Sequence, residues 1–250
     1  MTISWQELGD LAWPDIHSRP MVMVPVGSTE QHGPHLPLDT DTVIATAVTI
    51  AVADAVSLRT NGQVLVAPAI SYGSSGEHES FAGTASIGFE ALRFLVVELV
   101  RSLSAWCGRV VLVNAHGGNV AAVSAAVRQL RAECHDVAWL PCVTEGGDLH
   151  AGRVETSLML HLSPDTVRLE RAVAGDIRPL ADILPELKAH GVRAVSPSGV
   201  LGDPAGASVG EGQRSLELMV EDAFRRLTHG VADDHGMLAV DRRGTVRVPA

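Results

Sequence analysis

Histidine and carboxylate side chains are concentrated in a few short segments of this chain. The segment VPVGSTEQHGPHLPLDTDT, residues 24–42, contains Glu30, His32, His35, Asp39 and Asp41. The same residue types recur at His116, within NAHGGN, and at Glu155, within HAGRVETS. Imidazole nitrogens and carboxylate oxygens together form the mixed ligand sets that bind Zn, Mn or Fe. These segments therefore predict a metal site.

The balance of the two ligand types bears on the number of ions. A carboxylate can bridge two cations, whereas an imidazole cannot. Two histidines and three carboxylates suit two ions better than one, and the ligands we predict are Glu30, His32, Asp41, His116 and Glu155. Two ions roughly 3.5 to 4 Å apart would activate a water and polarise a carbonyl. The chemistry expected of such a site is hydrolysis.

Each of these residues also has a purely structural interpretation. Asp41 precedes an apolar helical stretch and could be its N-cap. His116 stands beside two glycines and could be a turn residue, and Glu155 could be an exposed or capping helix residue. Burying all of them without a cation would be costly in desolvation energy. We therefore favour the metal site.

Apolar and amphipathic segments alternate along the chain. Valine-rich runs, typical of strands buried on both faces, lie at 21–27, 62–70, 109–115 and 137–143. Stretches with helical length or periodicity lie at 41–56, 89–106, 119–134, 152–162 and 214–227. This alternation predicts an α/β fold, a three-layer sandwich with a mostly parallel central sheet. From residue 144 onward Gly and Pro interrupt the pattern at TEGGDLHAG, SPSGVLGDPAGASVGEG and HGVADDHG, which we predict to be loops around the site and at interfaces.

The predicted sheet would bring the chemical residues together. Glu30 and His32 follow the first predicted strand, Asp41 begins the next helix, and His116 follows the third strand. The carboxyl ends of parallel strands share one edge, where ligands bind in such folds. A loop-to-helix junction could deliver Glu155 to the same edge.

Composition limits the classes of function. A chain of 250 residues with 46% hydrophobic content can bury one large core, so one domain over 1–250 is expected. A net charge of −10 without a basic run argues against nucleic acid or anionic membrane as partner, and a small or peptide substrate fits better. Three cysteines without CxxC spacing and no signal pattern predict a reduced, cytoplasmic protein. No apolar run reaches the roughly 18 to 20 residues of a membrane span.

At these residues the sequence resembles the creatininase family of metal-dependent amidohydrolases. The resemblance runs in order through GSTEQHGPHLPLDTDT, GEHESFAGT, NAHGGN, HAGRVETSLML and SPSGVLGDP. It implies an α/β sandwich assembled into homo-oligomers such as hexamers. It also implies that Glu30, Asp41 and His116 hold one ion, while His32, Asp41 and a second glutamate hold the other, with Asp41 bridging.

The sequence departs from creatininase itself in two places. Creatininase has a glutamate two residues after the histidine that matches His116, where this chain has Gly118. We take Glu155 as the substitute, with Glu77 and His78 as the next candidates. Creatininase is also expected to place tryptophans around its substrate before the HAG motif, and here VTEGGDLHAG contains no aromatic residue. Creatinine is therefore not the expected substrate.

The remaining polar residues of the motifs can also be given roles, that of His150 from the same resemblance. His150 matches a histidine that passes a proton to the leaving amine, although a hydrogen bond within the loop is an alternative. Glu77 and His78 are assigned to substrate contact, with support of the metal loop as the alternative. Asn119 is assigned to substrate contact or to orienting the ligands.

Three functions remain open, and the first two are those that the resemblance to the creatininase family implies. The first is a metal-dependent peptidase that trims a modified ribosomal precursor peptide near its C-terminus and releases a dipeptide derived from Val and Tyr. The second is hydrolysis of a small cyclic amide or a formamide. The third is a non-catalytic metal-binding oligomer, which would need a closed ligand set with no open position.

Overall fold

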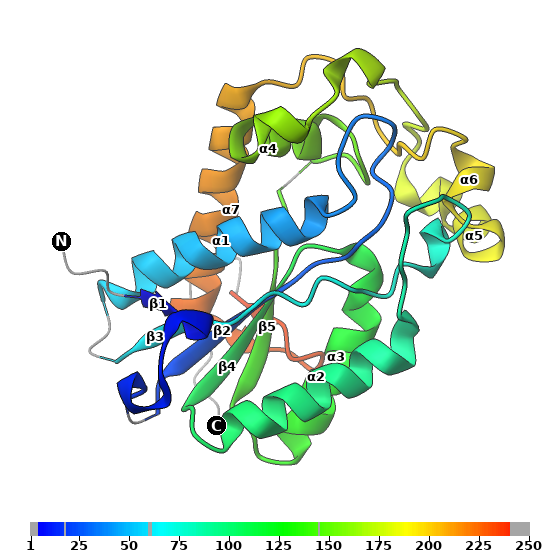
Figure 1. The fold of residues 1–250 in the computed structure, drawn as a ribbon. Helices are drawn as coiled ribbons and strands as arrows, with labels where there is room; N and C mark the ends of the chain where they lie inside the picture. Colours follow the sequence, from blue (N-terminus) through cyan, green and yellow to red (C-terminus); the bar gives the residue numbers. More distant parts are fainter. Residues whose placement is uncertain (1–4, 18, 60–61, 145, 241–250) are drawn as a thin grey trace.

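A five-stranded sheet forms the centre of the molecule in the computed structural model, which describes residues 5–17, 19–59, 62–144 and 146–240 (Figure 1). All of its strand pairs are parallel, in the order β1-β3-β2-β4-β5. The strands are β1 (Trp5–Glu7), β2 (Met21–Val26), β3 (Val64–Val66), β4 (Arg109–Asn114) and β5 (Val137–Pro141). The four predicted strands are confirmed, with that at 62–70 shortened to three residues.

Helices cover both faces of this sheet, as Figure 1 shows. The helices are α1 (Thr40–Ser57), α2 (Gly88–Ser104), α3 (Val120–Ala132), α4 (Arg153–Leu162), α5 (Leu180–His190), α6 (Val192–Val195) and α7 (Val209–His229). Short 3-10 turns lie at η1 (Leu8–Asp10), η2 (Trp13–Asp15), η3 (Gly76–His78), η4 (Gly117–Asn119), η5 (Pro164–Thr166) and η6 (Leu169–Arg171). A small hairpin, β6 (Val231–Ala232) and β7 (Leu238–Ala239), follows α7. The predicted three-layer α/β class is confirmed.

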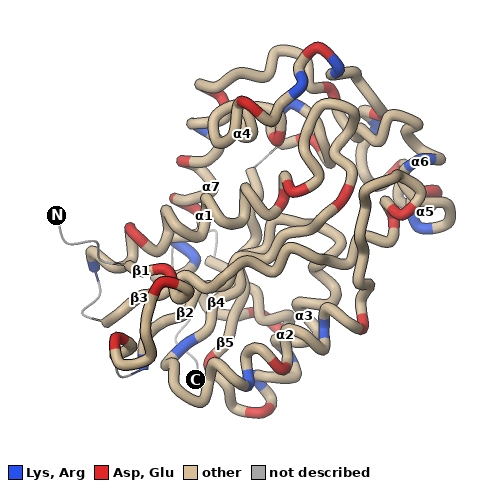
Figure 2. Tube along the Cα trace, viewed as in Figure 1, with Lys and Arg blue, Asp and Glu red and all other residues tan. Residues whose placement is uncertain are grey.

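The strands are apolar throughout because each of their faces packs against a helical layer. Met23 of β2 belongs to the core formed with α1, α4 and α7, whereas its neighbours Val22 and Val24 belong to the core formed with α2 and α3. Both cores are closed to solvent, and β2, β3 and β5 contain no charged residue. Figure 2 shows the charged positions mainly on the helices and loops around the sheet. This distribution explains the continuous valine-rich runs.

The order of the strands places a topological switch point between β2 and β4. From β2 the chain crosses through α1, on one face, to β3; β4 is followed by α3, on the opposite face. The loops after β2 and β4 therefore leave the sheet in opposite directions. In open parallel sheets this switch point is where ligands bind. The two segments richest in ligand residues follow these two strands.

Two features were not predicted from the sequence. β1 is a three-residue strand that pairs only with β3 at the edge of the sheet. α5 lies between the helices predicted at 152–162 and 214–227, in a stretch where no element was predicted. It contains Pro185, which cannot donate a backbone hydrogen bond within a helix. Both elements depend on contacts with distant parts of the chain more than on local pattern.

The helix α1 corrects one inference from composition. It is 18 residues long with a mean hydropathy of 1.3, so its length and composition alone would suffice for a membrane span. In the structure 56% of this helix is buried, and it packs on the sheet and α7. The apolar composition of α1 therefore does not distinguish it from a membrane span. Its packing on the sheet and on α7 identifies it as a core helix.

Close packing of α7 on α4 generates a first prediction. Gly212 of α7 lies against the backbone of Ser157 in α4, where an added Cβ would clash with the Ser157 carbonyl oxygen. Gly212→Ala should lower the free energy of unfolding by about 1–3 kcal/mol, because the helices must move apart. This is opposite in sign to the gain of up to about 1 kcal/mol that alanine brings to a helix. Denaturant titration measures the change.

Gly210→Ala is the matched control for this prediction. A Cβ at Gly210, in the same helix, would meet only the end of the Arg214 side chain at 3.6 Å. This variant should be neutral or slightly more stable. Equal stability of the two variants would contradict the close approach of α7 to α4.

Candidate metal centre

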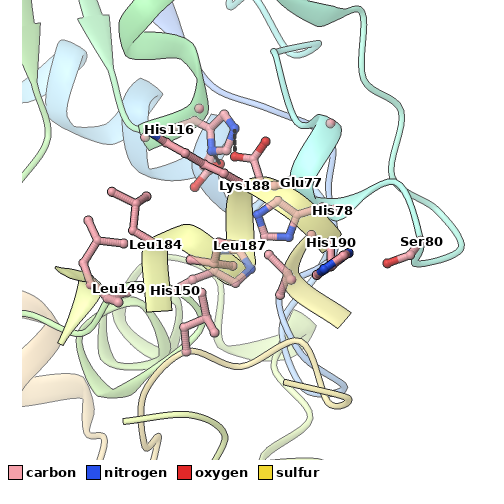
Figure 3. A pocket seen from close by; sticks show the side chains of 18 of the residues that line it. Glu77, His78, Ser80, His116, Leu149, His150, Leu184, Leu187, Lys188 and His190 are labelled. Carbon is pink, nitrogen blue, oxygen red and sulfur yellow. Dashed lines mark ion pairs between the residues drawn. The ribbon is translucent and has the colours of Figure 1, made fainter. Parts of the chain in front are cut away.

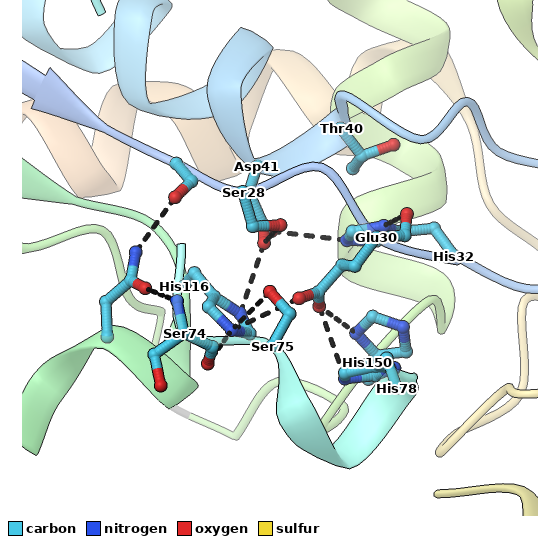
Figure 4. Close-up of polar contacts among 12 residues, drawn as sticks. Ser28, Glu30, His32, Thr40, Asp41, Ser74, Ser75, His78, His116 and His150 are labelled. Atoms are coloured by element: carbon cyan, nitrogen blue, oxygen red, sulfur yellow. Dashed lines mark hydrogen bonds and ion pairs between the residues drawn. The ribbon is translucent and has the colours of Figure 1, made fainter. Parts of the chain in front are cut away.

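All five predicted ligands meet at the carboxyl end of the sheet, together with two further histidines. Figure 4 shows four of these ligands, Glu30, His32, Asp41 and His116, with the histidines His78 and His150. They come from the loop after β2, the start of α1, η3, the loop after β4, the segment leading into α4 and the first turn of α4. We call this set the histidine–carboxylate cluster: Glu30, His32, Asp41, His78, His116, His150 and Glu155. Six of these residues are buried and Glu155 is partly buried. Residues that are up to 125 positions apart, from Glu30 to Glu155, thus share one small volume.

Asp41 occupies the middle of the cluster. Its Oδ1 lies 3.2 Å from His32 Nε2, its Oδ2 lies 3.2 Å from His116 Nδ1, and Ser28 Oγ donates to Oδ2 at 2.7 Å. Asp41 is the second residue of α1, and the N-cap position belongs to Asp39. The N-cap interpretation of Asp41 is therefore wrong. One oxygen directed to each side is the arrangement that a bridging carboxylate requires.

Glu30 is a buried carboxylate that lacks hydrogen bonds. Neither of its oxygens accepts one within the described residues. Oε2 lies 3.1 Å from His116 Nε2, while Oε1 lies 3.2 Å from His78 Nε2 and 3.8 Å from His150 Nδ1. An unsatisfied buried carboxylate is strongly unfavourable unless a cation neutralises it. Donor atoms of Glu30, Asp41 and His116 lie within 4.8 Å of one another, so these three residues fit the first predicted ion.

A second group of donors lies on the other side of Asp41. Donor atoms of His32, His150 and Glu155 lie within 4.8 Å of one another, and His32 Nε2 is 4.0 Å from Glu155 Oε2. Glu155 Oε2 also accepts a hydrogen bond from the backbone of Ala151 at 2.5 Å. Glu155 is therefore placed where the second predicted ion needs a carboxylate. A third group, which joins Glu30, His78 and His150, overlaps with both.

His150 can serve as a ligand or as a proton carrier in this geometry. Its Nε2 lies 2.7 Å from the backbone oxygen of Gln31, to which it donates when protonated. That hydrogen bond leaves Nδ1 directed at Glu30 Oε1 with a free lone pair. A backbone carbonyl that fixes the tautomer in this way is a common support for a metal-binding or catalytic imidazole.

The cluster retains positive charge in the absence of metal. Burial alone would lower the pKa of His32, but the Asp41 carboxylate raises it to about 10. Burial also opposes protonation of His116, but Glu30 and Asp41 raise its pKa to about 9. Burial raises the pKa of Glu30 itself to about 7. Protons on two imidazoles thus compensate the carboxylates, and bound cations would displace them.

The other two histidines of the cluster behave in the opposite way. Burial, together with His116 and His32, lowers the pKa of His78 to about 3. Burial, together with His32 and His78, holds the pKa of His150 well below its ordinary value. Both imidazoles are therefore neutral at pH 7. A neutral imidazole can bind a metal or accept a proton.

Glu77 stands next to the position where this chain departs from creatininase. Its Oε1 lies 3.8 Å from His116 Nε2, and a Cβ added to Gly118 would come within 2.6 Å of the same oxygen. The absence of a side chain at 118 therefore makes room for the Glu77 carboxylate. Glu77 lines the cavity described below, as its predicted substrate contact requires.

Asn119 has a different place in the structure. It is fully buried, and its Nδ2 donates to the backbone oxygen of Gly27 at 2.9 Å and to Asn114 Oδ1 at 3.1 Å. Its Oδ1 accepts from the backbone of Ser74 at 2.8 Å. These bonds join the loops that follow β2, β3 and β4. They give Asn119 a positioning role, and the geometry offers no support for the predicted substrate contact.

Sequence reasoning missed several side chains that hold the cluster. Ser28 donates to Asp41, and Gln31 Nε2 lies 2.7 Å from His78 Nδ1. Both residues lie within the motif GSTEQH, between or beside the ligands, and that proximity was the available signal. Thr156, which hydrogen-bonds His35 at 2.8 Å, likewise follows Glu155 directly.

The cluster opens into a cavity of about 860 Å³ (Figure 3). Asp41, His78, His116, His150 and Glu155 form one side of the cavity. Residues of α5, a helix that the sequence did not predict, also line the cavity. Such a volume falls in the range of small-molecule and peptide sites. The candidate metal centre therefore has an open face.

Comparison with known proteins identifies the family. Residues 3–227 match the family described as creatinine amidohydrolase, and the chain therefore belongs to the creatininase family. It is 55% identical to a mycofactocin precursor peptide peptidase of Mycobacterium ulcerans over 226 residues, which cover 88% of this chain and 89% of that protein. A peptidase of the same name from Mycolicibacterium smegmatis is 50% identical over 232 residues, 92% of this chain and 94% of that protein.

A solved structure shares the fold. The crystal structure of creatinine amidohydrolase superimposes with a TM-score of 0.70 at 31% identity, over 88% of this chain and 97% of that one. Other creatininase structures are described as a Zn-Zn type and as a manganese form. The predicted family and its class of hydrolases are confirmed.

Proposed function

We propose that this chain is a mycofactocin precursor peptide peptidase, a metal-dependent hydrolase that cleaves a modified precursor peptide near its C-terminus and releases a dipeptide derived from Val and Tyr. The observation that carries the proposal is a buried histidine–carboxylate cluster open to a cavity of about 860 Å³. The relatives of 50 to 55% identity that bear this name support the substrate.

Two divalent ions, Zn, Fe or Mn, fit the donors of the cluster. Glu30, Asp41 and His116 would hold one, and His32, Asp41 and Glu155 the other. The unsatisfied carboxylate of Glu30 and the two-sided position of Asp41 support this division. When bound, such a pair supplies polarisation of the scissile carbonyl and activation of a water.

The residues of the chain would orient the peptide and move a proton. We assign to His150 the transfer of a proton to the leaving amine through Nδ1, because the Gln31 carbonyl occupies the Nε2 side. An imidazole that is neutral at pH 7 can take up the proton released by the attacking water and pass it on. Glu77, at the cavity surface beside His116, can accept a hydrogen bond from a backbone amide of the peptide.

Two alternatives have less support. Hydrolysis of a small cyclic amide would be expected to use aromatic rings around the substrate, and among the described residues the cavity lining contains no Trp, Tyr or Phe. A non-catalytic metal protein would need a closed ligand set, whereas this cluster opens to the cavity. The peptidase therefore remains the function that the geometry favours.

Assembly and location are part of the same proposal. We expect a cytoplasmic homo-oligomer, such as a hexamer, in keeping with the family resemblance. Large apolar side chains stand exposed on the single chain, among them Phe94 at 67% and Tyr72 at 54%. Apolar surface of this kind is often covered when subunits associate.

Peptide cleavage tests the proposed function. Protein loaded with Zn, Fe or Mn should release a dipeptide from the modified precursor peptide, detected by mass spectrometry, and should leave creatinine and formamides intact. Protein stripped by a chelator is the control and should be inactive until metal is restored. Hydrolysis of creatinine without peptide cleavage would contradict the proposal, as would full activity of the stripped protein.

The roles of Glu155 and His150 can be separated by two variants. Glu155→Gln should lower the occupancy of one ion and leave the other, because a neutral amide is a poorer ligand for a dication. His150→Ala should keep both ions and reduce turnover by roughly 10²- to 10⁴-fold, the scale of losing a positioned proton carrier. Metal analysis and single-turnover rates on the same preparations measure both effects.

Glu170→Gln provides the matched control, because Glu170 is an exposed glutamate outside the cavity. It should keep both ions and full turnover. Loss of metal in His150→Ala would show that His150 is a metal ligand and not the proton carrier. Full metal content in Glu155→Gln would mean that another side chain, Glu77 or His78, holds the second ion.

A further inference from the structure

Part of the cavity lining beside the histidine–carboxylate cluster is apolar. Leu180, Leu184 and Leu187 of α5 are spaced so that they share one face of the helix, and all three line the cavity. Leu149, which precedes the cluster residue His150, and Leu201 complete this wall. Figure 3 shows Leu149, Leu184 and Leu187 near His150. We call these five residues the leucine wall.

Part of the leucine wall is exposed to water. Leu180 is 45% exposed and Leu149 is 41% exposed, although both belong to a concave surface that also contains buried ligands. Apolar area exposed to water is unfavourable, and an apolar group bound there would recover that free energy. The wall is therefore suited to an apolar side chain of the substrate.

The position of α5 is fixed relative to the cluster by a small core of its own. Buried Ile183 of α5 packs with Val192 and Leu201, apart from the two cores of the sheet. Immediately after α5, Gly191 has φ +75°, and a Cβ there would come within 2.9 Å of the backbone oxygen of Glu77. The end of α5 thus rests on η3, which also carries His78. This contact sets the distance between the leucine wall and the metal ligands.

One positive charge stands at the end of the same helix. Lys188 is the single lysine of the sequence, it is exposed, and it lines the cavity. No ion pair involves it among the described residues, whereas Arg178, near the start of α5, lies 2.5 Å from Asp176 and 4.0 Å from Glu186. A cation without a protein partner beside a cavity of an acidic protein can attract a carboxylate of the substrate.

We propose that α5 selects the substrate: the leucine wall binds an apolar side chain next to the scissile bond, and Lys188 pairs with a carboxylate of the same peptide. This inference rests on the proposed peptidase function and adds its specificity. The histidine–carboxylate cluster then faces the bond to be cleaved, while the leucine wall contacts the substrate side chain next to that bond. The polar cluster is not suited to binding an apolar side chain, and the leucine wall has no group that could take part in bond cleavage.

Paired peptides test the leucine wall. Two substrates should differ only in carrying a large apolar or a polar residue beside the cleaved bond. The wild-type protein should favour the apolar peptide by 10-fold or more in kcat/KM, the scale expected for a hydrophobic pocket. Leu180→Asn and Leu184→Asn should each lower kcat/KM for the apolar peptide, so that the ratio of kcat/KM for the two peptides approaches one. The metal content should be unchanged.

Leu218→Asn is the control, because Leu218 lies on α7, is 60% exposed and does not line the cavity. It should keep the wild-type preference. A preference unchanged in both cavity variants would overturn the role of the wall. Failure of the wild-type protein to cleave either peptide would instead overturn the proposed function, so the two failures are distinguishable.

A charge variant tests Lys188 separately. Lys188→Met should raise KM about 10-fold and leave kcat and metal content unchanged, because a pairing charge contributes to binding and not to bond cleavage. Arg171→Met, which removes an exposed charge outside the cavity, should have the wild-type KM. Peptides with a C-terminal amide, or with Asp and Glu replaced by Asn and Gln, identify the source of the carboxylate. A KM equal to wild type for every peptide would overturn the role of Lys188.

Discussion

The burial of carboxylates among imidazoles is the constraint on which the rest of this structure depends. Glu30 has both oxygens shielded from water, and neither meets the geometric criteria for a hydrogen bond within the part of the chain that the structure describes. Asp41 is placed between two histidines at 3.2 Å on each side. Such groups are tolerated in a protein interior only when positive charge compensates them. Protons on His32 and His116 provide that charge in the metal-free cluster, and divalent ions would provide it in a working enzyme.

Contacts among several rigid elements of the fold hold these buried charged groups in place. The loops after β2 and β4 separate at the switch point of the sheet, and Asn119 ties them together through the backbone oxygen of Gly27. Gly27 also lies against the start of α1, where a Cβ would come within 2.5 Å of Thr42. This contact holds Asp41, one residue earlier, against the loop that carries Glu30. The position of the central carboxylate thus follows from packing that has no chemical role of its own.

The sequence was informative wherever a local pattern had a single structural solution. Valine-rich runs identified β2, β4 and β5 because both of their faces are buried, and the motifs after those strands identified the ligands because strand ends converge. The pattern did not identify α5, since Pro185 interrupts the helical signal and the helix depends on a small core formed with distant residues. The leucine wall was therefore not predicted.

The role of individual site residues was less accessible than the site itself. Asp41 had the sequence context of an N-cap, and only the position of Asp39 ahead of it shows that the carboxylate is free to turn toward the histidines. His150 remains a proton carrier or a ligand, because its Nδ1 lies 3.8 Å from Glu30 while its other nitrogen is held by a backbone carbonyl. Spacing in a sequence does not encode distances of this kind.

The bridging position of Asp41 is the central feature of the proposed dinuclear site, and it can be tested by metal analysis of one variant. The wild-type protein, purified and saturated with Zn or Mn, should contain close to two ions per chain. Asp41→Ala should contain neither, because each ion loses the ligand that it shares with the other, while circular dichroism shows the fold intact. Retention of both ions by the folded variant would contradict a site bridged by Asp41.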